Sequence, residues 1–491
     1  MTMISEVGLQ AFPIDRYAPI SNHDAVEELR ELAVRASECL AGQAMWHVNS
    51  TAAGGGVAEM LPSMLGYCRD LGIDARWLVI NGEPDFFQIT KRLHHALHGE
   101  RGDGTPLDDE AHRIYERTME ENAADILSVV RPRDIVILHD PQTIGLAEEL
   151  SRHGAIVIWR CHIGQSEIMP EAEAAWDFLA PYLRHARRYV FSREAYIPAI
   201  LDHARCRIVQ PTIDPFSAKN QELDDDTVRT ILVHTGILAR PLPHKPNYEF
   251  QHRDGSIGRV DRHADIVRCG RSTNPDVPLI VQVSRWDPLK DPIGVMHGFV
   301  HYINANSDSN AELLLVGPSV RSVADDPESP ATFQKVFSAW CDLHHWQRDR
   351  VHLIMLPMVD IEENAVIVNA LQRHASIIVQ KSLQEGFGLT VTEAMWKGRP
   401  VIASRVGGIQ DQITHGKHGL LIDEPTDLEE FSRALEAVMN DPECARNMGA
   451  AGRERVRDEF LQTRSVFHYM NLAIEFCGGQ DQCEIANPAH G

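Results

Sequence analysis

The sequence predicts an α/β protein made of two Rossmann-like domains, each built on a doubly wound parallel sheet. Short β-branched segments alternate with helical segments along most of the chain, which is the pattern of βαβ units. The chain has 491 residues, more than one ordinary hydrophobic core takes, so we expect two or three domains. Because ligands of such sheets gather at the carboxyl ends of the strands, we expect the two domains to face a central cleft.

The first domain is expected to span residues 1–213. Its expected strands are residues 45–49, 76–80, 135–139, 156–160, 188–192 and 207–210. Its expected helices are residues 59–71, 109–130, 171–187 and 194–204. The two prolines in Pro211-Thr212-Ile213-Asp214-Pro215 suit an extended crossing, and we place the domain boundary there.

The second domain is expected to span residues 214–463. Its expected strands are residues 279–284, 312–316, 351–355, 377–380, 400–403 and 419–422, and its expected helices are residues 292–304, 332–345, 362–373 and 428–439. Residues 239–272 are rich in Arg, His, Pro and Gly, and we interpret them as a long surface insertion. A final helix, about residues 464–478, can pack back on the first domain.

The composition excludes several functional classes. A net charge of -23 speaks against nucleic acid as a partner and requires any phosphate site to be basic against an acidic background. The nine cysteines are scattered without a C-x-x-C pair, so we expect free thiols and a cytoplasmic protein rather than a disulfide framework. We find neither a signal peptide nor an apolar run of about 18 residues, and expect no membrane association.

The segment Glu385-Gly386-Phe387-Gly388-Leu389-Thr390-Val391-Thr392-Glu393 is the most informative of the chain. It follows an expected buried strand and is typical of a strand, a loop and the start of a helix. Amides at a helix start favour an anionic ligand such as phosphate. Glu385 in the loop and Glu393 in the helix could then bind two hydroxyl-rich ends of one ligand, which fits a nucleotide-sugar. The alternative is that Glu393 is a solvated or capping residue.

Two further loops follow first strands of their domains. Arg285 and Lys290 follow the first strand of the second domain and could hold a diphosphate through charge-assisted hydrogen bonds, although a solvated basic pair is the simpler interpretation. The glycines Gly54, Gly55 and Gly56 follow the first strand of the first domain and allow close approach of a ligand, or a simple tight turn.

Polar residues also follow two later strands of the first domain. His162 could hydrogen-bond a sugar hydroxyl or a phosphate, or transfer a proton; the alternative is a satisfied, partly buried histidine. Asp140 and Gln142 could bind an incoming hydroxyl compound, or cap a helix. The pair His344-His345 lacks Asp or Cys partners at ligand spacing, and we expect no metal site there.

Together these segments resemble the retaining glycosyltransferases of family four, which have the two-Rossmann, B-type fold. Glu385 and Glu393 match the family's E-x7-E motif, Arg285 and Lys290 match its donor-diphosphate pair, and the three glycines match its N-terminal loop. The trehalose glycosyltransferring synthases are most similar, through residues 47–51, 159–163, 213–215 and 363–370. Ala52-Ala53 stand where such relatives would have a bulkier residue, which leaves the acceptor open.

The resemblance implies a role for each matched residue. It implies catalytic roles for Glu385, His162, Arg285 and Lys290. It implies a donor site made of Gly55, Gly56, Arg285, Lys290, Glu385, Gly386, Phe387, Gly388, Leu389 and Glu393, and an acceptor site made of Asn49, Asp140, Gln142 and His162. Glu385 would contact the donor sugar, Glu393 the ribose, and the basic pair the leaving diphosphate. It further implies a homodimer.

No metal site is expected, since no Asp-x-Asp motif lies near the phosphate site and the basic pair can replace a metal; Mg²⁺ is expected at most to stimulate. The expected reaction transfers a hexose, glucose by preference, from a nucleotide-sugar to a small sugar, with trehalose as the preferred product. Alternatives are a trehalose phosphorylase, a transferase for another sugar or cyclitol, a nucleotide-sugar 2-epimerase, and a non-catalytic nucleotide-sugar sensor.

Overall fold

The computed structural model describes residues 4–21, 23–52, 55–165, 169–320 and 328–476. The chain forms two compact units. Unit 1 contains residues up to Pro211 together with those from Gln462 onward, and unit 2 contains Thr212–Leu461. The chain thus returns to unit 1 after it has completed unit 2.

The sheet of unit 1 has seven strands in the order β1-β3-β2-β4-β5-β6-β7. Only β1, at the edge, runs antiparallel to its neighbour. The strands are β1 (Ile4–Glu6), β2 (Met45–Asn49), β3 (Ala75–Ile80), β4 (Ile135–His139), β5 (Ile156–Arg160), β6 (Arg188–Phe191) and β7 (Cys206–Ile208). Since β2 lies between β3 and β4, the direction of the connections reverses between β2 and β4, which makes this edge a topological switch point.

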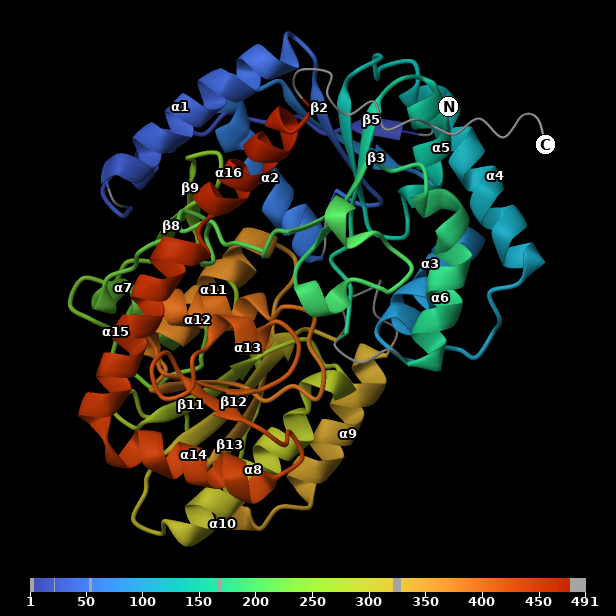
Figure 1. Cartoon of the computed structure of the whole chain (residues 1–491). Helices are drawn as coiled ribbons and strands as arrows, with labels where there is room; N and C mark the ends of the chain where they lie inside the picture. Colours follow the sequence, from blue (N-terminus) through green and yellow to red (C-terminus); the bar gives the residue numbers. More distant parts are fainter. Residues whose placement is uncertain (1–3, 22, 53–54, 166–168, 321–327, 477–491) are drawn as a thin grey trace. The chain divides into compact units, whose positions relative to one another are not determined.

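Helices cover both faces of this sheet (Figure 1). They are α1 (His23–Leu40), α2 (Gly56–Asp70), α3 (Pro84–Leu97), α4 (Asp109–Ile126), α5 (Ala147–Arg152), α6 (Pro170–Leu183) and α16 (Gln462–Ile474). α3, α4 and α6 pack over the face that carries Trp46, Val48 and Leu138, whereas α1, α2 and α16 pack together on the other face. Alternate residues of a strand point to opposite faces, so His47 belongs to the face that α16 covers.

The sheet of unit 2 also has seven strands, in the order β10-β13-β12-β11-β14-β15-β16. Again only one edge strand, β10, is antiparallel. The strands are β10 (Asp265–Val267), β11 (Leu279–Val283), β12 (Glu312–Pro318), β13 (Val351–Leu356), β14 (Ile377–Gln380), β15 (Val401–Ser404) and β16 (Leu420–Ile422). The switch point of this sheet lies between β11 and β14, because β12 and β13 lie on one side of β11 and β14 lies on the other.

The helices of unit 2 are α7 (Asp225–His234), α8 (Pro292–Ala305), α9 (Ser329–Cys341), α10 (His345–Arg348), α11 (Ile361–His374), α12 (Leu389–Trp396), α13 (Ile409–Gln412), α14 (Leu428–Asn440) and α15 (Pro442–Glu459). A core of Ile280, Met296, Phe299, Leu313 and Phe431 lies between the sheet and the pair α8 and α14. A separate two-stranded sheet pairs β8 (Glu249–Gln251) with β9 (Ile257–Arg259).

The predicted fold class is confirmed, and three local predictions need correction. Residues 194–204 form only short 3₁₀ turns at Glu194–Tyr196 and His203–Arg205, because Pro198 between them has no N–H to donate to a helix. Residues 239–272 form the β8–β9 hairpin and contribute β10 to the edge of the main sheet. Six described cysteines are free thiols, but Cys39 is disulfide-bonded, so the prediction of free thiols is wrong there.

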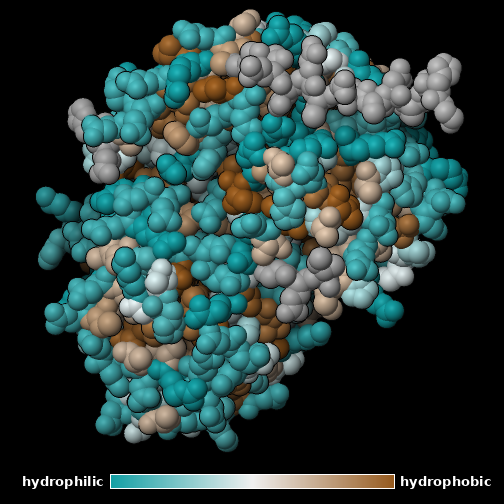
Figure 2. Space-filling view, in the orientation of Figure 1, coloured by the Kyte–Doolittle hydropathy of each residue, from teal (hydrophilic) through white to brown (hydrophobic). Residues whose placement is uncertain are grey.

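The surface agrees with the polar composition. The face drawn in Figure 2 is covered mainly by hydrophilic residues, with the hydrophobic ones in separate patches. Within the described ranges, no helix combines the length and the hydrophobicity that crossing a bilayer requires.

Candidate active site

The switch point of unit 2 brings together the loops after β11 and β14. A backbone hydrogen bond from Leu383 N to Leu289 O, 2.8 Å long, joins the two loops. The side-chain amide of Gln282, at the end of β11, donates to the carbonyl of Lys290 at 2.6 Å. These hydrogen bonds hold the two loops together, and residues far apart in sequence meet at one sheet edge.

Lys290 and Glu385 form an ion pair at this edge. Lys290 Nζ lies 2.7 Å from Glu385 Oε2, and the two side chains are 17% and 13% exposed. The same carboxylate oxygen accepts from Gln380 Nε2 and Ser382 Oγ, each at 3.3 Å. The structure thus brings together two predicted site residues and fixes the orientation of both side chains.

The loops are balanced in charge rather than basic. Lys381, which is fully buried, pairs with Asp291, and Arg285 lies 3.4 Å from Asp287. Together with Lys290 and Glu385, these pairs match three cations with three carboxylates. The expectation of a locally basic phosphate site stays a prediction, and a phosphate at these loops would have to take over hydrogen bonds that carboxylates now make. Arg285 is best placed for that exchange, because its side chain is 64% exposed.

A glycine turn connects Glu385 to α12. Gly388 has φ of 85°, a conformation that favours glycine, and a Cβ there would lie 2.9 Å from Ile409 Cγ1. Gln412 holds the turn through its side-chain amide, which donates to the carbonyl of Phe387 at 2.5 Å. α12 begins at Leu389, and its Val391 N–H already donates to the carbonyl of Gly388 at 2.9 Å, so anion binding at this helix start stays a prediction.

Glu393 lies inside α12 and is 6% exposed. Lys219 Nζ is 3.4 Å from its Oε1 atom, and Lys397 Nζ donates to its backbone carbonyl at 3.2 Å. Lys219 is not among the predicted site residues and comes from the segment that opens unit 2. Glu393 is thus a buried, paired carboxylate and not a solvated or capping residue.

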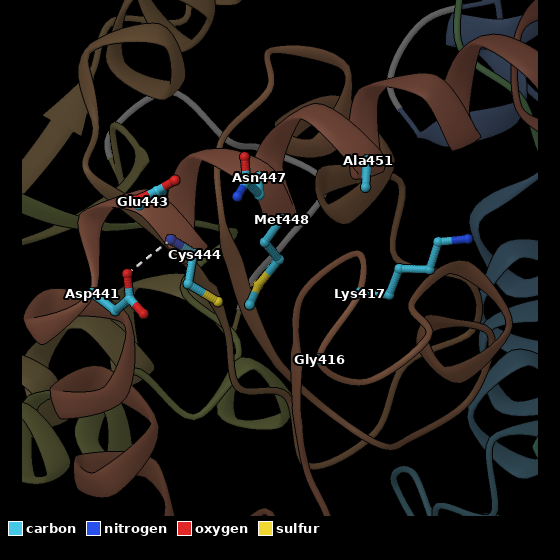
Figure 3. Close-up of a pocket in the computed structure, with 8 residues that line it drawn as sticks. All are labelled: Gly416, Lys417, Asp441, Glu443, Cys444, Asn447, Met448 and Ala451. Atoms are coloured by element: carbon cyan, nitrogen blue, oxygen red, sulfur yellow. Dashed lines mark hydrogen bonds between the residues drawn. The ribbon is translucent and has the colours of Figure 1, made fainter.

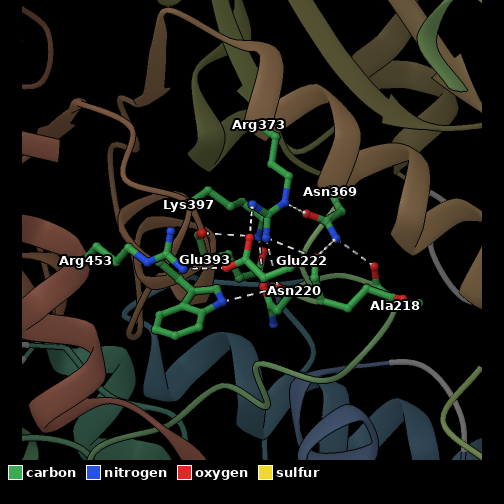
Figure 4. Close-up of polar contacts among 10 residues, drawn as sticks. Ala218, Asn220, Glu222, Asn369, Arg373, Glu393, Lys397 and Arg453 are labelled. Atoms are coloured by element: carbon green, nitrogen blue, oxygen red, sulfur yellow. Dashed lines mark hydrogen bonds and ion pairs between the residues drawn. The ribbon is translucent and has the colours of Figure 1, made fainter. Parts of the chain in front are cut away.

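A polar network that runs from buried to exposed residues lies next to Glu393 (Figure 4). Arg373 Nη1 bonds Glu222 at 2.7 Å, and Arg453 pairs with the other carboxylate oxygen of Glu222. Lys397 donates to Asn220 Oδ1 at 2.8 Å. Burial lowers the pKa of Lys397 to about 7, against the raising effect of the Glu393 charge. The network fixes the segment 218–222 against α11 and α12.

The switch point of unit 1 begins with the predicted glycine loop. Gly55 has φ of 81° and precedes α2, whose first residue is Gly56, and both are exposed. A Cβ at Gly55 would meet no neighbouring atom. The positive φ at this position, and not crowding, is therefore what favours glycine. Gly54 and Ala53 lie outside the described residues.

Three histidines form a chain across the strand ends of unit 1. His162 Nε2 lies 2.9 Å from His139 Nδ1, and His139 Nε2 lies 2.9 Å from His47 Nδ1. His47 and His139 are buried and His162 is half-buried. Burial lowers the pKa of His47 to about 3 and, with nearby positive charge, holds the pKa values of His139 and His162 well below the ordinary range.

Asp140 and Arg160 complete this cluster. Asp140, in a left-handed conformation with φ of 60°, accepts from the backbone N–H of His162 at 2.7 Å. Burial raises the pKa of Asp140 to about 7. Arg160 is 1% exposed and donates to Ser192 Oγ at 3.2 Å, while its Nε and Nη1 atoms have no partner among the described residues. The Arg160 guanidinium contributes to the pKa shifts of His139, Asp140 and His162, after burial as the largest cause.

The other two predicted acceptor residues are Asn49 and Gln142. The Asn49 side chain is used inside the protein, because Nδ2 donates to the carbonyl of Thr51 and Oδ1 accepts from Trp77 Nε1, both at 2.7 Å. Asn49 therefore fixes the loop after β2. Gln142 is half-buried in the turn after β4.

Two other features share no residue with the predicted site. A pocket of about 470 Å³ lies against α15 and is lined by Lys417, Asp441, Glu443, Cys444 and four neighbours (Figure 3). Elsewhere, Cys269, His345 and Asp349 come close enough to hold a metal ion, which corrects the expectation that His344-His345 has no such partners. However, His345 meets Cys269 through Nε2 at 3.7 Å and Asp349 through Nδ1 at 3.5 Å, so these contacts use opposite ring nitrogens.

Comparisons with known proteins agree with this geometry. Two family models match the chain: trehalose synthase, N-terminal domain, over residues 47–198, and glycosyl transferases group 1 over residues 270–455. The trehalose synthase of Pyrococcus horikoshii is 34% identical over 94% of this chain and 95% of its own length. The trehalose phosphorylase of Pleurotus pulmonarius is 24% identical over 92% of this chain and 59% of its own.

A solved structure shows the same fold. The α,α-trehalose-phosphate synthase (UDP-forming) from Burkholderia vietnamiensis superposes with a TM-score of 0.62, at 13% identity, over 88% of this chain and 98% of that chain. The likeness supports the assignment of two Rossmann-like units.

Proposed function

Since the chain belongs to the trehalose synthase family and is a glycosyltransferase, we propose that it transfers glucose from a nucleotide-glucose to free glucose with retention, and so forms trehalose. The observation that carries this proposal is the Lys290–Glu385 pair at the switch point of unit 2, directly before the amino end of α12. The geometry offers cation, carboxylate and helix amides at one place, as a glycosyl diphosphate requires.

The charges suit the departure of a diphosphate. When the anomeric bond breaks, negative charge grows on the leaving phosphate and positive charge on the sugar. Lys290 has two N–H groups beyond the one that Glu385 accepts, and these can meet the phosphate. The Glu385 carboxylate can accept from sugar hydroxyls and favours the cationic sugar. Glu393, held by Lys219, is the candidate ligand of the ribose hydroxyls.

Retention then requires attack on the face that the leaving group vacates, because the proposed roles leave neither glutamate as a nucleophile. The leaving phosphate would accept the proton of the incoming hydroxyl. His162 is the candidate group that hydrogen-bonds a sugar hydroxyl. We propose that no metal is required, because Arg285 and Lys290 supply the positive charge, and that the enzyme is a cytoplasmic homodimer.

The direct test incubates the protein with several nucleotide-glucoses against a panel of free sugars and cyclitols. We expect one nucleotide-glucose to give α,α-1,1-linked trehalose with glucose as acceptor, identified by NMR, and unchanged turnover after chelation of divalent metals. Transfer to a different acceptor would replace trehalose as the product. A donor that epimerises without an acceptor, or binding without turnover, would refute transferase activity.

A phosphorylase is the second candidate, favoured by the match to the Pleurotus enzyme. Incubation with trehalose and inorganic phosphate, without nucleotide, distinguishes the two. Release of glucose phosphate would establish the phosphorylase, whereas release of glucose only when a nucleoside diphosphate is present would support the synthase.

A further inference from the structure

We propose that His139 and His47 are positioning residues that fix the tautomer of His162, so that its Nδ1 atom carries a hydrogen and donates to a sugar hydroxyl. The use of this donor rests on the proposed function. The tautomer itself is a property of the protein without ligand and can be measured alone.

The three imidazoles are joined edge to edge. The ring centroids of His139 and His162 are 5.2 Å apart with 13° between the ring planes, and those of His47 and His139 are 5.1 Å apart with 29°. With nitrogen–nitrogen distances of 2.9 Å, these separations are what coplanar rings show when one hydrogen bond joins them through their edges. Each contact is therefore a true hydrogen bond and needs one N–H and one bare nitrogen.

The three hydrogen-bonded imidazoles carry no net charge. Burial disfavours a charge on His47 and His139, and the buried guanidinium of Arg160 disfavours a second positive charge beside it. The other titratable groups against the chain are Asp140, Cys161 and Tyr469, and burial raises the pKa of each. All three imidazoles thus carry one hydrogen each.

Neutral rings joined in this order allow only two arrangements. If His47 Nδ1 carries its hydrogen, it donates to His139 Nε2, His139 Nδ1 donates to His162 Nε2, and His162 carries its own hydrogen on Nδ1. In the opposite arrangement every hydrogen is on Nε2, and His162 Nδ1 is bare. The state of His162 is therefore decided at the His47 end of the chain.

That end favours the first arrangement. His47 Nε2 and the Tyr469 hydroxyl are both buried without a partner among the described residues, and the two rings are in edge contact with centroids 5.1 Å apart. The two atoms make no hydrogen bond to each other, but a bare Nε2 can accept from one bridging water that itself accepts from the phenol O–H. A protonated Nε2 would leave the phenol hydrogen, or its own, buried and unpaired, which is the more costly outcome.

The consequence appears at His162. No hydrogen bond from the part of the chain that the structure describes reaches its Nδ1 atom, which is therefore the nitrogen left for a ligand. An N–H there donates to a hydroxyl oxygen and cannot accept. Tyr469, on the last helix, thereby influences which ring nitrogen of His162 carries the hydrogen.

The test measures the tautomer by NMR of the full chain labelled with ¹⁵N-histidine, using couplings between ring nitrogens and carbon-bound protons. The His162 signals are assigned by their loss in His162→Gln. We expect Nδ1 of His162 to be protonated and Nε2 to be bare across neutral pH. A protonated Nε2 on His162 would overturn the proposal. This measurement is made on the original protein and needs no substitution.

Variants then test the positioning role. His47→Leu should move His162 toward the Nε2–H form and lower kcat about tenfold, the effect of one hydrogen bond of about 1.4 kcal/mol, with KM for the nucleotide-sugar within about twofold. His47→Asn, whose amide can still donate near the Nδ1 position, should restore most of the loss. Tyr469→Phe should act in the same direction as His47→Leu. His112→Leu is the matched control, because His112 is a half-buried histidine of unit 1 that bonds Tyr182 instead.

The outcomes separate this proposal from the proposed function. Unchanged His162 signals in His47→Leu would refute the positioning role. Nδ1–H on His162 in a protein that transfers no sugar would leave the tautomer established and refute the transferase.

Discussion

At the switch point of unit 2, three cations lie beside three carboxylates, whereas at that of unit 1 three imidazoles are joined by hydrogen bonds and a buried guanidinium lowers the pKa values of two of them. Both edges arise in the same way, since each follows the first parallel strand of a seven-stranded sheet. The charged edge suits a ligand whose charge grows during reaction, because ion pairs can exchange partners. The neutral edge suits hydroxyl groups, because its donors have fixed directions. The same fold thus supplies two kinds of chemistry through the residues at its strand ends.

The largest effect should come from breaking the central ion pair of unit 2. Lys290→Ala leaves the Glu385 carboxylate largely buried without its cation, and should reduce the stability of unit 2 by about 3 kcal/mol and kcat at least tenfold. Adding Glu385→Gln removes the unpaired charge and should restore stability but not turnover. Urea unfolding and steady-state kinetics measure the two effects.

Lys335→Ala, on an exposed position of α9, is the matched control and should change neither quantity. Turnover of Lys290→Ala within about threefold of the original protein would remove Lys290 from the proposed mechanism.

Acid should destabilise unit 1 more than unit 2. The folded-state pKa values of His47, His139 and His162 lie below the ordinary value of 6.5, so the unfolded chain binds more protons and stability falls as the pH drops below about 6.5. Asp140 acts in the opposite direction, since its raised pKa lets the folded state hold a proton between about 4 and 7. The unfolded state of unit 1 then binds about two more protons than the folded state. The free energy of unfolding of unit 1 should therefore fall by about 2.5 kcal/mol between pH 6 and pH 5.

Limited proteolysis in urea, with peptides of β4 and β14 quantified by mass spectrometry, follows the units separately. His374 and His418 of unit 2 shift in the same direction without a comparable cluster, so unit 2 should lose less. Equal losses in both units would contradict the contrast drawn between the two edges.

The glycines of the two loops should differ in their tolerance of a side chain. Both Gly388 and Gly55 have positive φ, which costs an alanine about 1 kcal/mol. A Cβ at Gly388 would also meet Ile409 Cγ1 at 2.9 Å, whereas the space at Gly55 is open. Gly388→Ala should therefore cost about 2 kcal/mol and Gly55→Ala about 1 kcal/mol, measured as changes in the free energy of unfolding. The reverse order would mean that crowding does not distinguish the two turns.

The smallest effect should follow the loss of Arg285. Its side chain is 64% exposed, so solvent screens its charge, and Arg285→Ala should lower kcat/KM about threefold. The loss should shrink when the assay is repeated at high salt. A loss as large as that of Lys290→Ala would show that Arg285 becomes buried against the ligand.

The central strands were predictable because they are buried on both faces and read as continuous apolar runs. Residues 45–49, 135–139, 156–160 and 377–380 match β2, β4, β5 and β14 to the residue. The edge strands β1 and β10 were not predicted, since three-residue strands at a sheet edge leave almost no pattern.

The site was predictable only where chemistry follows a strand directly. Glu385, Lys290 and His162 each stand in the connection that follows a strand, and topology brings them to the switch points. Lys219 and Tyr469 come from a crossing segment and the last helix, so no local pattern connects them to Glu393 or His47. The chain of three histidines was not predicted for a related reason. His47 lies within β2 and points to the face opposite Trp46.

The return of α16 to unit 1 has a consequence for biosynthesis. Every residue of unit 2 leaves the ribosome before the helix that carries Tyr469, so unit 2 can mature while the sheet face around His47 still lacks its cover. The half of the protein made first is therefore finished last, and a nascent chain that stops short of Gln462 would expose polar imidazoles and apolar helix surfaces to chaperones.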